Sequence, residues 1–179
     1  MRLHLVRHLK PTIDAGICYG RADLLVDPAL LEQALPALQA RLPTAGVIAS
    51  PLTRCASLAQ RLSANVTFDA RLAELDFGAW ELRRWDDIAR EEIDAWAADV
   101  ALYRPGGGES VFTLALRIAA FYDELMHNPA HDTVIVCHAG SIRLLTARHA
   151  GLAPEAMARH AAEQPHAIAY GEVVMLSGV

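Results

Sequence analysis

The sequence predicts an α/β protein, a three-layer α/β/α sandwich with a mainly parallel sheet. Short apolar runs rich in β-branched residues alternate with longer segments that have helical spacing, and the run TVIVC at 133–137 is the clearest buried strand. Strands that alternate with helices are typical of parallel sheets covered on both faces. No linker, repeat or low-complexity segment interrupts the 179 residues. We therefore expect one domain over residues 1–179.

The first half of the chain supplies three of the expected strands. Residues 2–6 form the first, and a polar loop follows it to about residue 27. Leucines at helical spacing predict a helix over 28–41. We expect Ser50 and Pro51 to begin the next helix, because Ser is a favoured N-cap and Pro a favoured first helical residue. The other two strands are expected at 47–49 and 66–68.

The second half is expected to be more helical. Its predicted elements are a loop over 71–80, a helix over 85–102, a break at 105–108, a helix over 110–126, the strand 133–137, a helix from about 141, and a closing hairpin of 167–170 with 172–176. In open parallel sheets, ligands bind beyond the carboxyl ends of the strands. The residues that directly follow each strand are therefore the candidates for a binding site.

Composition excludes several classes of protein. The formal net charge is -5 and the basic residues are scattered, which disfavours nucleic-acid binding. The three cysteines, Cys18, Cys55 and Cys137, form no CxxC pair and predict buried free thiols. The start of the chain does not read as a signal peptide, and no apolar run approaches the roughly 18 residues of a spanning helix. We expect a cytoplasmic protein without a membrane partner, and a homodimer is compatible with the sequence.

Two histidines follow two of the strands directly. His8 comes after the first strand, His138 comes after TVIVC, and Arg7 precedes His8. Arg54 lies in the first turn of the helix that follows the strand at 47–49. The sequence therefore delivers two imidazoles and two guanidinium groups to one edge of the sheet.

That set of side chains suits phosphoryl chemistry. Arginine binds phosphate oxygens with a planar fork of donors. A neutral imidazole can attack phosphorus and form a covalent intermediate, and a leaving alkoxide needs a proton from a carboxylic acid. Ordinary surface or core histidines and a metal site are the alternatives. Carboxylates at ligand spacing are absent near these histidines, so we expect neither metal nor cofactor.

The motifs around these residues resemble those of the histidine phosphatase superfamily, also called phosphoglycerate-mutase-like. The similar segments occur in the family's order and are LVRH (5–8), SPLTRC (50–55), LAELDFGAWE (72–81), PGGGES (105–110) and VIVCHAG (134–140). Any one of them is weakly specific, whereas five in order are specific. The resemblance covers nearly the whole chain and implies a phosphatase acting on a small phosphorylated metabolite.

The resemblance also assigns roles to residues. It implies that His8 is a nucleophile that becomes phosphorylated and that Arg7 and Arg54 bind the phosphoryl group. His138 would stabilise that group during transfer, and Glu74 would be the general acid. Asp76 and Glu81 compete with Glu74 for the acid role. Substrate contacts are expected from Tyr19, Gly20 and Arg21, whereas Arg143 and the tryptophans Trp80, Trp85 and Trp96 read as structural.

The segments RHLKP (7–11) and GICYGRAD (16–23) are similar to the alpha-ribazole phosphatase subgroup, which implies hydrolysis of alpha-ribazole 5'-phosphate in cobalamin biosynthesis. A broad-specificity phosphatase of the same fold and a non-catalytic phosphate-binding module are the alternatives. Three positions depart from the family pattern. Leu9 and Leu82 replace glycines, and Leu25 replaces a proline. Leu9, directly after the nucleophile, is expected to reshape the pocket, because glycine there lets the backbone approach phosphate.

Overall fold

The computed structural model describes residues 1–127, 132–163 and 167–178. Its sheet has five strands in the order β3-β2-β4-β1-β5. The strands are β1 (Arg2–Arg7), β2 (Gly46–Ala49), β3 (Val66–Phe68), β4 (Thr133–Cys137) and β5 (Val173–Ser177). All neighbouring pairs are parallel except β1 with β5. The expected mainly parallel sheet is confirmed.

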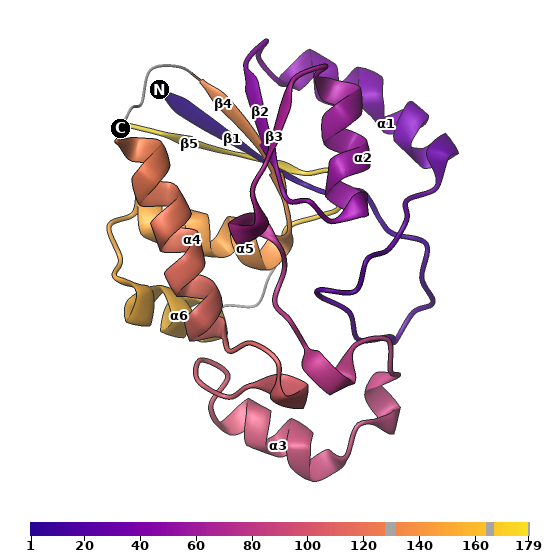
Figure 1. Ribbon diagram of the computed structural model, residues 1–179, viewed down its shortest axis with the longest axis vertical. Coiled ribbons are helices and arrows are strands. Elements are labelled where there is room, and N and C mark those ends of the chain that lie inside the picture. The colour runs from indigo at the N-terminus through magenta and orange to yellow at the C-terminus, as the bar shows by residue number, and fades with distance from the viewer. Residues whose placement is uncertain (128–131, 164–166, 179) are drawn as a thin grey trace.

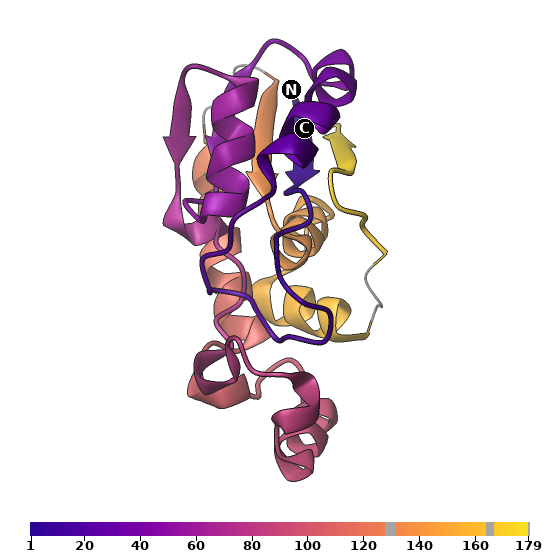
Figure 2. The same cartoon turned by 90° about the vertical axis from the view of Figure 1, so that its right-hand side faces the viewer.

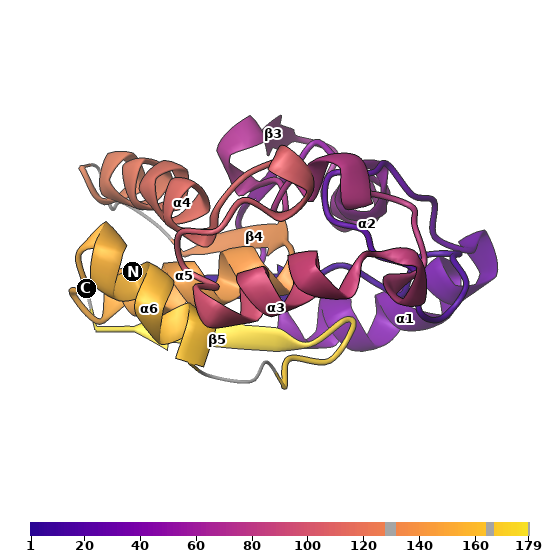
Figure 3. The same cartoon turned by 90° about the horizontal axis from the view of Figure 1, so that it is seen from below.

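Helices cover both faces of this sheet. In the described residues they are α1 (Pro28–Arg41), α2 (Thr53–Leu62), α3 (Arg90–Ala98), α4 (Val111–Met126), α5 (Ala139–His149) and α6 (Pro154–Glu163). Figure 3 shows α1 and α2 on one side of the strands and α4, α5 and α6 on the other. The apolar side chains separate in the same way, because alternate residues of β1 and β4 point into opposite cores. The three-layer sandwich is thus confirmed, while helix α6 was not predicted.

The first strand illustrates how the sequence produces this arrangement. Leu3 and Leu5 are fully buried on the α4–α6 side, and Val6 is fully buried on the α1–α2 side. A central strand buried on both faces reads as an almost continuous apolar run. Because β1, β2 and β4 are parallel, their carboxyl ends meet at one edge of the sheet.

Helix α2 begins later than predicted. Its first helical residue is Thr53, and Ser50 and Pro51 precede the helix. The Asp23 carboxylate, thirty positions earlier in the chain, accepts hydrogen bonds from the Thr53 backbone N–H at 2.6 Å and from its hydroxyl at 2.7 Å. A side chain from the loop after β1 thus satisfies a donor that a local cap satisfies in most helices.

The predicted helix over 85–102 is wrong at both ends. A single 3₁₀ turn over Trp85–Asp87 precedes α3, and Ala89 between them has an extended backbone. Trp85 stacks on Trp96, with ring centroids 5.9 Å apart, and both tryptophans meet the ring of Phe77 edge to face. Packing of these aromatic rings overrides the local helical pattern.

The predicted closing hairpin is also wrong. Residues 167–170 form no strand, and β5 pairs with β1 instead. The Ile168 carbonyl accepts a hydrogen bond from the Arg7 guanidinium at 2.5 Å, and the Gly171 N–H donates to the Arg7 carbonyl at 3.1 Å. This segment therefore lies against the end of β1 as an irregular wall.

Segment 79–105, which carries α3, lies beyond the carboxyl ends of the strands (Figure 1). Its two ends meet at what we call the glycine clasp, made by Gly78, Gly106 and Gly108. A Cβ on Gly78 would lie 2.3 Å from the Gly106 carbonyl oxygen, and one on Gly106 would lie 2.2 Å from the Phe77 oxygen. Only glycine permits this approach, and Gly78 and Gly106 also have positive φ angles of 53° and 58°.

The loop after β1 extends toward the same region (Figure 2). Cys18 exchanges backbone hydrogen bonds of 2.8 Å with Leu82 and Arg83. Trp80, Ile88 and Cys18 are buried together there in a small apolar cluster. The loop and segment 79–105 thus form a second layer of structure around the strand ends.

Candidate active site

A cavity of about 430 Å³ opens beyond the carboxyl ends of the strands. Charged and polar side chains line one end, and apolar side chains line the rest. The lining residues are Arg7, His8, Tyr19, Arg54, Glu74, Leu75, Phe77, Trp85, Trp96, Val100, Val111, Leu114, Ala139, Gly140, Arg143, Leu144, Ala161 and Tyr170. The volume is within the range of cavities that hold small metabolites.

His8 lies at the buried end of the cavity and is 3% exposed. Its Nδ1 is 2.7 Å from the carbonyl oxygen of Leu9. A carbonyl only accepts, so Nδ1 carries the proton and the lone pair of the ring is on Nε2. Burial, together with the charges of Arg54 and Arg7, lowers the pKa of His8 from 6.5 to about 3. The imidazole is therefore neutral at neutral pH and has the lone pair that a nucleophile needs.

Leu9 does not enter the cavity. Its side chain is buried in the core between the sheet and α1, and it contacts Gly171. Among the described residues, Leu82 is the one non-glycine residue with a positive φ, so the backbone at Leu9 needs no glycine. The expected reshaping of the pocket by the Leu9 side chain is wrong.

Arg7 and Arg54 approach His8 from two elements. Arg54 is fully buried, and its guanidinium donates to the carbonyls of Ala22 at 2.8 Å and Gly20. The Arg7 guanidinium lies 3.9 Å above the ring of Tyr170. In each arginine the buried Nε–H has no acceptor among the residues that the structure describes. Buried donors of native proteins usually have a partner, so this pair fits an anionic ligand.

His138 is also fully buried, at the N-terminus of α5. Its ring centroid is 5.1 Å from that of His8, and its Nε2 is 2.9 Å from the Ser50 hydroxyl. Burial and the neighbouring charge of Arg54 hold the pKa of His138 well below its ordinary value. Ser50 thus orients a histidine, which the reading of Ser50 as a helix cap missed.

Glu74 is the one carboxylate among the three candidate acids that lines the cavity. Its Oε2 accepts a hydrogen bond from the Gly140 N–H at 3.1 Å, and its Oε1 accepts one from the Leu75 N–H at 3.0 Å. A Cβ on Gly140 would lie 2.4 Å from Oε1, so the glycine lets the carboxylate reach the start of α5.

The competing carboxylates are engaged elsewhere. Glu81 accepts hydrogen bonds from the backbone N–H groups of Gly20, Arg21, Ala22 and Phe77. Asp76 accepts from the Gly78 N–H and lines a separate surface depression. The position of these groups favours Glu74 as the proton donor.

The residues predicted to contact substrate divide into two groups. Tyr19 lines the cavity, and its hydroxyl is 2.7 Å from that of Tyr170. Gly20 and Arg21 do not line it, because Gly20 supports Arg54 through its carbonyl and Arg21 lines the surface depression of Asp76. Tyr170 was missed, and no local motif around it indicates a site.

The outer end of the cavity is apolar and aromatic. Phe77, Trp85 and Trp96 line it together with Val100 and Val111. Trp80, in contrast, is fully buried and does not line the cavity. Arg143 also lines the cavity, and its guanidinium donates to the Ala161 carbonyl. Burial lowers the pKa of Arg143. The structural readings of Trp85, Trp96 and Arg143 therefore missed their place in the cavity wall.

The part of the chain that the structure describes contains neither a metal-binding cluster nor a membrane-spanning helix. No group of three or more His, Cys, Asp and Glu side chains there is arranged to hold a metal ion. No helix among the same residues is long and apolar enough to cross a bilayer.

The paired histidines and arginines at parallel strand ends define a phosphoryl-transfer site of one recognisable kind. The pattern of the histidine phosphatase superfamily (branch 1) matches residues 3–170. The chain belongs to this superfamily and is a phosphatase.

Several relatives share one activity. Adenosylcobalamin/alpha-ribazole phosphatase of Escherichia coli is 30% identical over 168 residues, which are 87% of this chain and 82% of that protein. Its Salmonella typhimurium counterpart is 30% identical over 83% of this chain and 79% of its own. The crystal structure of alpha-ribazole phosphatase from Shigella flexneri is similar with a TM-score of 0.83 and 26% identity, covering 99% of this chain and 90% of its own.

A second activity occurs among similar structures. A mycobacterial glucosyl-3-phosphoglycerate phosphatase has a TM-score of 0.79 at 26% identity, over 97% of this chain and 88% of that chain. The similarity therefore supports phosphatase chemistry more strongly than it supports any one substrate.

Proposed function

We propose that this phosphatase works through a phosphohistidine on His8 and hydrolyses alpha-ribazole 5'-phosphate in cobalamin biosynthesis. The observation that carries the mechanism is the neutral His8, whose Nε2 lone pair lies in a cavity lined by Arg7, Arg54 and Glu74. We place the enzyme in the cytoplasm, acting alone or as a homodimer.

In the first half-reaction, His8 Nε2 attacks phosphorus and the bond from phosphorus to the ester oxygen breaks. The Nε–H groups of Arg7 and Arg54 bind the phosphoryl oxygens, and His138 stabilises the charge that develops on them. Protonated Glu74 gives its proton to the leaving alkoxide. The products are the free alcohol and phosphorylated His8.

In the second half-reaction, a water molecule attacks the phosphohistidine. Glu74, now a carboxylate, accepts a proton from that water. The bond between phosphorus and Nε2 breaks, and inorganic phosphate leaves with His8 restored as a neutral imidazole.

The proposal for the substrate has two supports. Relatives over most of the chain carry the name adenosylcobalamin/alpha-ribazole phosphatase. The outer end of the cavity has three aromatic side chains, Phe77, Trp85 and Trp96, which suit the planar ring system of a ribazole. The same apolar wall can form few hydrogen bonds with hydroxyl groups of a substrate, so a broad-specificity phosphatase is the second candidate.

The test compares alpha-ribazole 5'-phosphate with p-nitrophenyl phosphate in the presence of a chelator, with His8→Ala as control. Acid-labile phosphate bound to His8 after quenching, detected by mass spectrometry, would support the covalent mechanism. Equal kcat/KM values for the two esters would favour broad specificity. A wild-type protein that hydrolyses neither ester would overturn the proposed function.

A further inference from the structure

Arg117 in α4 does not line the cavity, yet its guanidinium uses all its donors, one of them on the lining residue Glu74. Its side chain is 16% exposed and that of its partner Glu109 is 11% exposed. Nε and one terminal nitrogen donate to the two Glu109 oxygens at 2.8 Å each. The remaining N–H groups donate to three backbone carbonyls, those of Arg71, Ala73 and Glu74. All five N–H groups of a guanidinium are thus satisfied.

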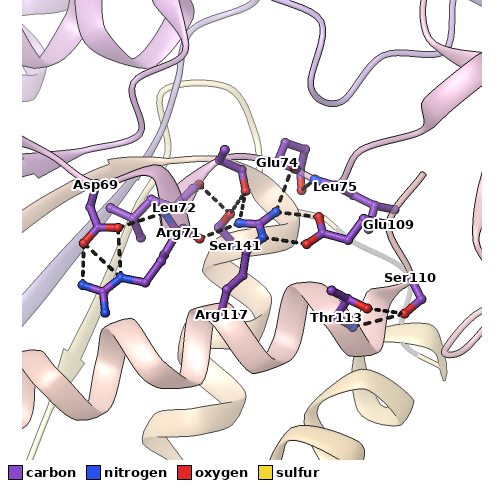
Figure 4. Close-up of polar contacts among 11 residues, drawn as sticks. Asp69, Arg71, Leu72, Glu74, Leu75, Glu109, Ser110, Thr113, Arg117 and Ser141 are labelled. Carbon is purple, nitrogen blue, oxygen red and sulfur yellow. Dashed lines mark hydrogen bonds and ion pairs between the residues drawn. The ribbon is translucent and has the colours of Figure 1, made fainter.

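The three carbonyls belong to the segment that carries Glu74. Figure 4 shows the Arg117 guanidinium between this segment and the Glu109 carboxylate. The fourth carbonyl of the segment, that of Leu72, accepts a hydrogen bond from the Ser141 hydroxyl at 3.0 Å. Helices α4 and α5 therefore hold four consecutive carbonyls from two directions.

These hydrogen bonds also hold Glu74 itself. Arg117 donates to the Glu74 carbonyl at 3.1 Å, while the Glu74 carboxylate accepts from Leu75 and from Gly140 at the start of α5. Both ends of the residue are fixed. The backbone N–H of Glu109 also donates to the Asp76 carbonyl at 2.7 Å, which holds the chain just beyond Glu74.

We propose that Arg117, oriented by Glu109, is a positioning residue that holds Glu74 where it can protonate the leaving group. The inference rests on the proposed role of Glu74 as general acid. Lysine cannot replace Arg117, because an ammonium group has three donors and no planar fork. The buried ion pair of Arg117 and Glu109 therefore serves to position the Glu74 carboxylate.

The role can be measured through the leaving group. p-Nitrophenolate leaves without a proton, whereas an alkoxide needs one, so loss of the general acid affects alkyl phosphates selectively. The ratio of kcat/KM for p-nitrophenyl phosphate to kcat/KM for glycerol 2-phosphate reports this effect, because kcat/KM covers only the steps through the first chemical one. A change in folding or in phosphate binding lowers both values and leaves the ratio constant.

The variants are Glu74→Gln, Arg117→Gln and Glu109→Gln. The matched control is Arg71→Gln, a change on the same segment that removes the two ion pairs of Arg71, with Asp69 and with Glu124, but no bond to a carbonyl. We expect the ratio to rise by roughly 100-fold in Glu74→Gln and about tenfold in Arg117→Gln, since small displacements of catalytic groups cost this much. Glu109→Gln should show a smaller rise and Arg71→Gln none.

An unchanged ratio in Arg117→Gln and Glu109→Gln would overturn the positioning role. If Arg117→Gln fails to fold, by circular dichroism, Glu109→Gln decides alone, because it keeps the Arg117 side chain but removes the carboxylate charge that orients its guanidinium. If the wild type is active but the ratio is unchanged in Glu74→Gln, Glu74 is not the general acid. This inference then fails, whereas the phosphatase activity stands. A wild type without activity would instead remove the proposed function.

Discussion

The two ends of the cavity are built on different principles. At the inner end, His8 and Arg54 line the cavity, and His138 lies beside His8 outside the lining. All three follow strands of the central sheet, are buried, and are each held by a hydrogen bond to a carbonyl or hydroxyl oxygen. At the outer end, Trp85 and Trp96 belong to segment 79–105 and are held by contacts between aromatic rings. Under the proposed function, the sheet supplies the reacting groups and the added segment determines the choice of substrate.

The largest expected effect lies at the inner end. His8→Asn should lower kcat/KM by roughly 10⁴-fold or more for every ester, because the nucleophile is lost. His160→Asn, an exposed histidine on α6, is the matched control and should be unaffected. A kcat/KM of His8→Asn within tenfold of wild type would show that another residue is the nucleophile. It would also contradict the contrast between the two ends of the cavity.

The second expected effect is on the pH dependence of protein stability, and it also arises at the inner end. The pKa of His8 is about 3 in the folded chain and near 6.5 when unfolded, so below pH 6.5 the unfolded chain binds the extra proton. Stability is therefore lost as pH falls from 6.5 toward 3. Urea unfolding at pH 7 and pH 5 should show that wild type loses about 2 kcal/mol more than His8→Asn. Equal losses in the two proteins would contradict a buried neutral His8.

A smaller effect is expected at the outer end. Trp96→Ala should raise KM for 1-naphthyl phosphate about tenfold, equal to about 1.4 kcal/mol, through lost apolar contact. It should change kcat for glycerol 2-phosphate little. Phe68→Ala, which removes an exposed aromatic ring on β3, controls for general destabilisation. If kcat falls equally for both esters, the two ends are not independent.

The smallest effect concerns the backbone that supports the outer end. Leu82 has a φ of 63° and a side chain 56% exposed, at the position where family members usually have glycine. Leu82→Gly should stabilise the protein by about 1 kcal/mol, because left-handed conformation costs a non-glycine residue more than glycine loses in entropy. The melting temperature should rise by about 2–4 °C. A lower melting temperature would show that the leucine side chain has a packing role.

The same division explains what could be predicted from the sequence. The strands and the residues that follow them were predictable, because buried apolar runs are local and the next residue must emerge at the sheet edge. His8, Arg54 and His138 were found in this way, and their roles remain proposals. The aromatic wall was not found, because a tryptophan that lines a cavity has the same pattern as one that packs in a core.

Three of the errors share one physical cause. The start of α2 is set by Asp23, the orientation of His138 by Ser50, and the wall beside Arg7 by Tyr170. In each case the partner is distant in sequence, and its polar contact competes with a plausible local one. Local spacing carries no information about such partners, whereas it carries most of the information about strands.

The glycine clasp has a consequence for how proteins with this sheet diversify. Because segment 79–105 leaves and returns at one point, Gly78 against Gly106, its length is uncoupled from the geometry of the strand ends. The entropic free-energy cost of closing a loop rises slowly, by about 0.6 kcal/mol for each doubling of its length. An insertion in the part of the segment that carries α3 is therefore inexpensive, and a new substrate range can be acquired there while Glu81 continues to hold the loop whose carbonyls bind Arg54.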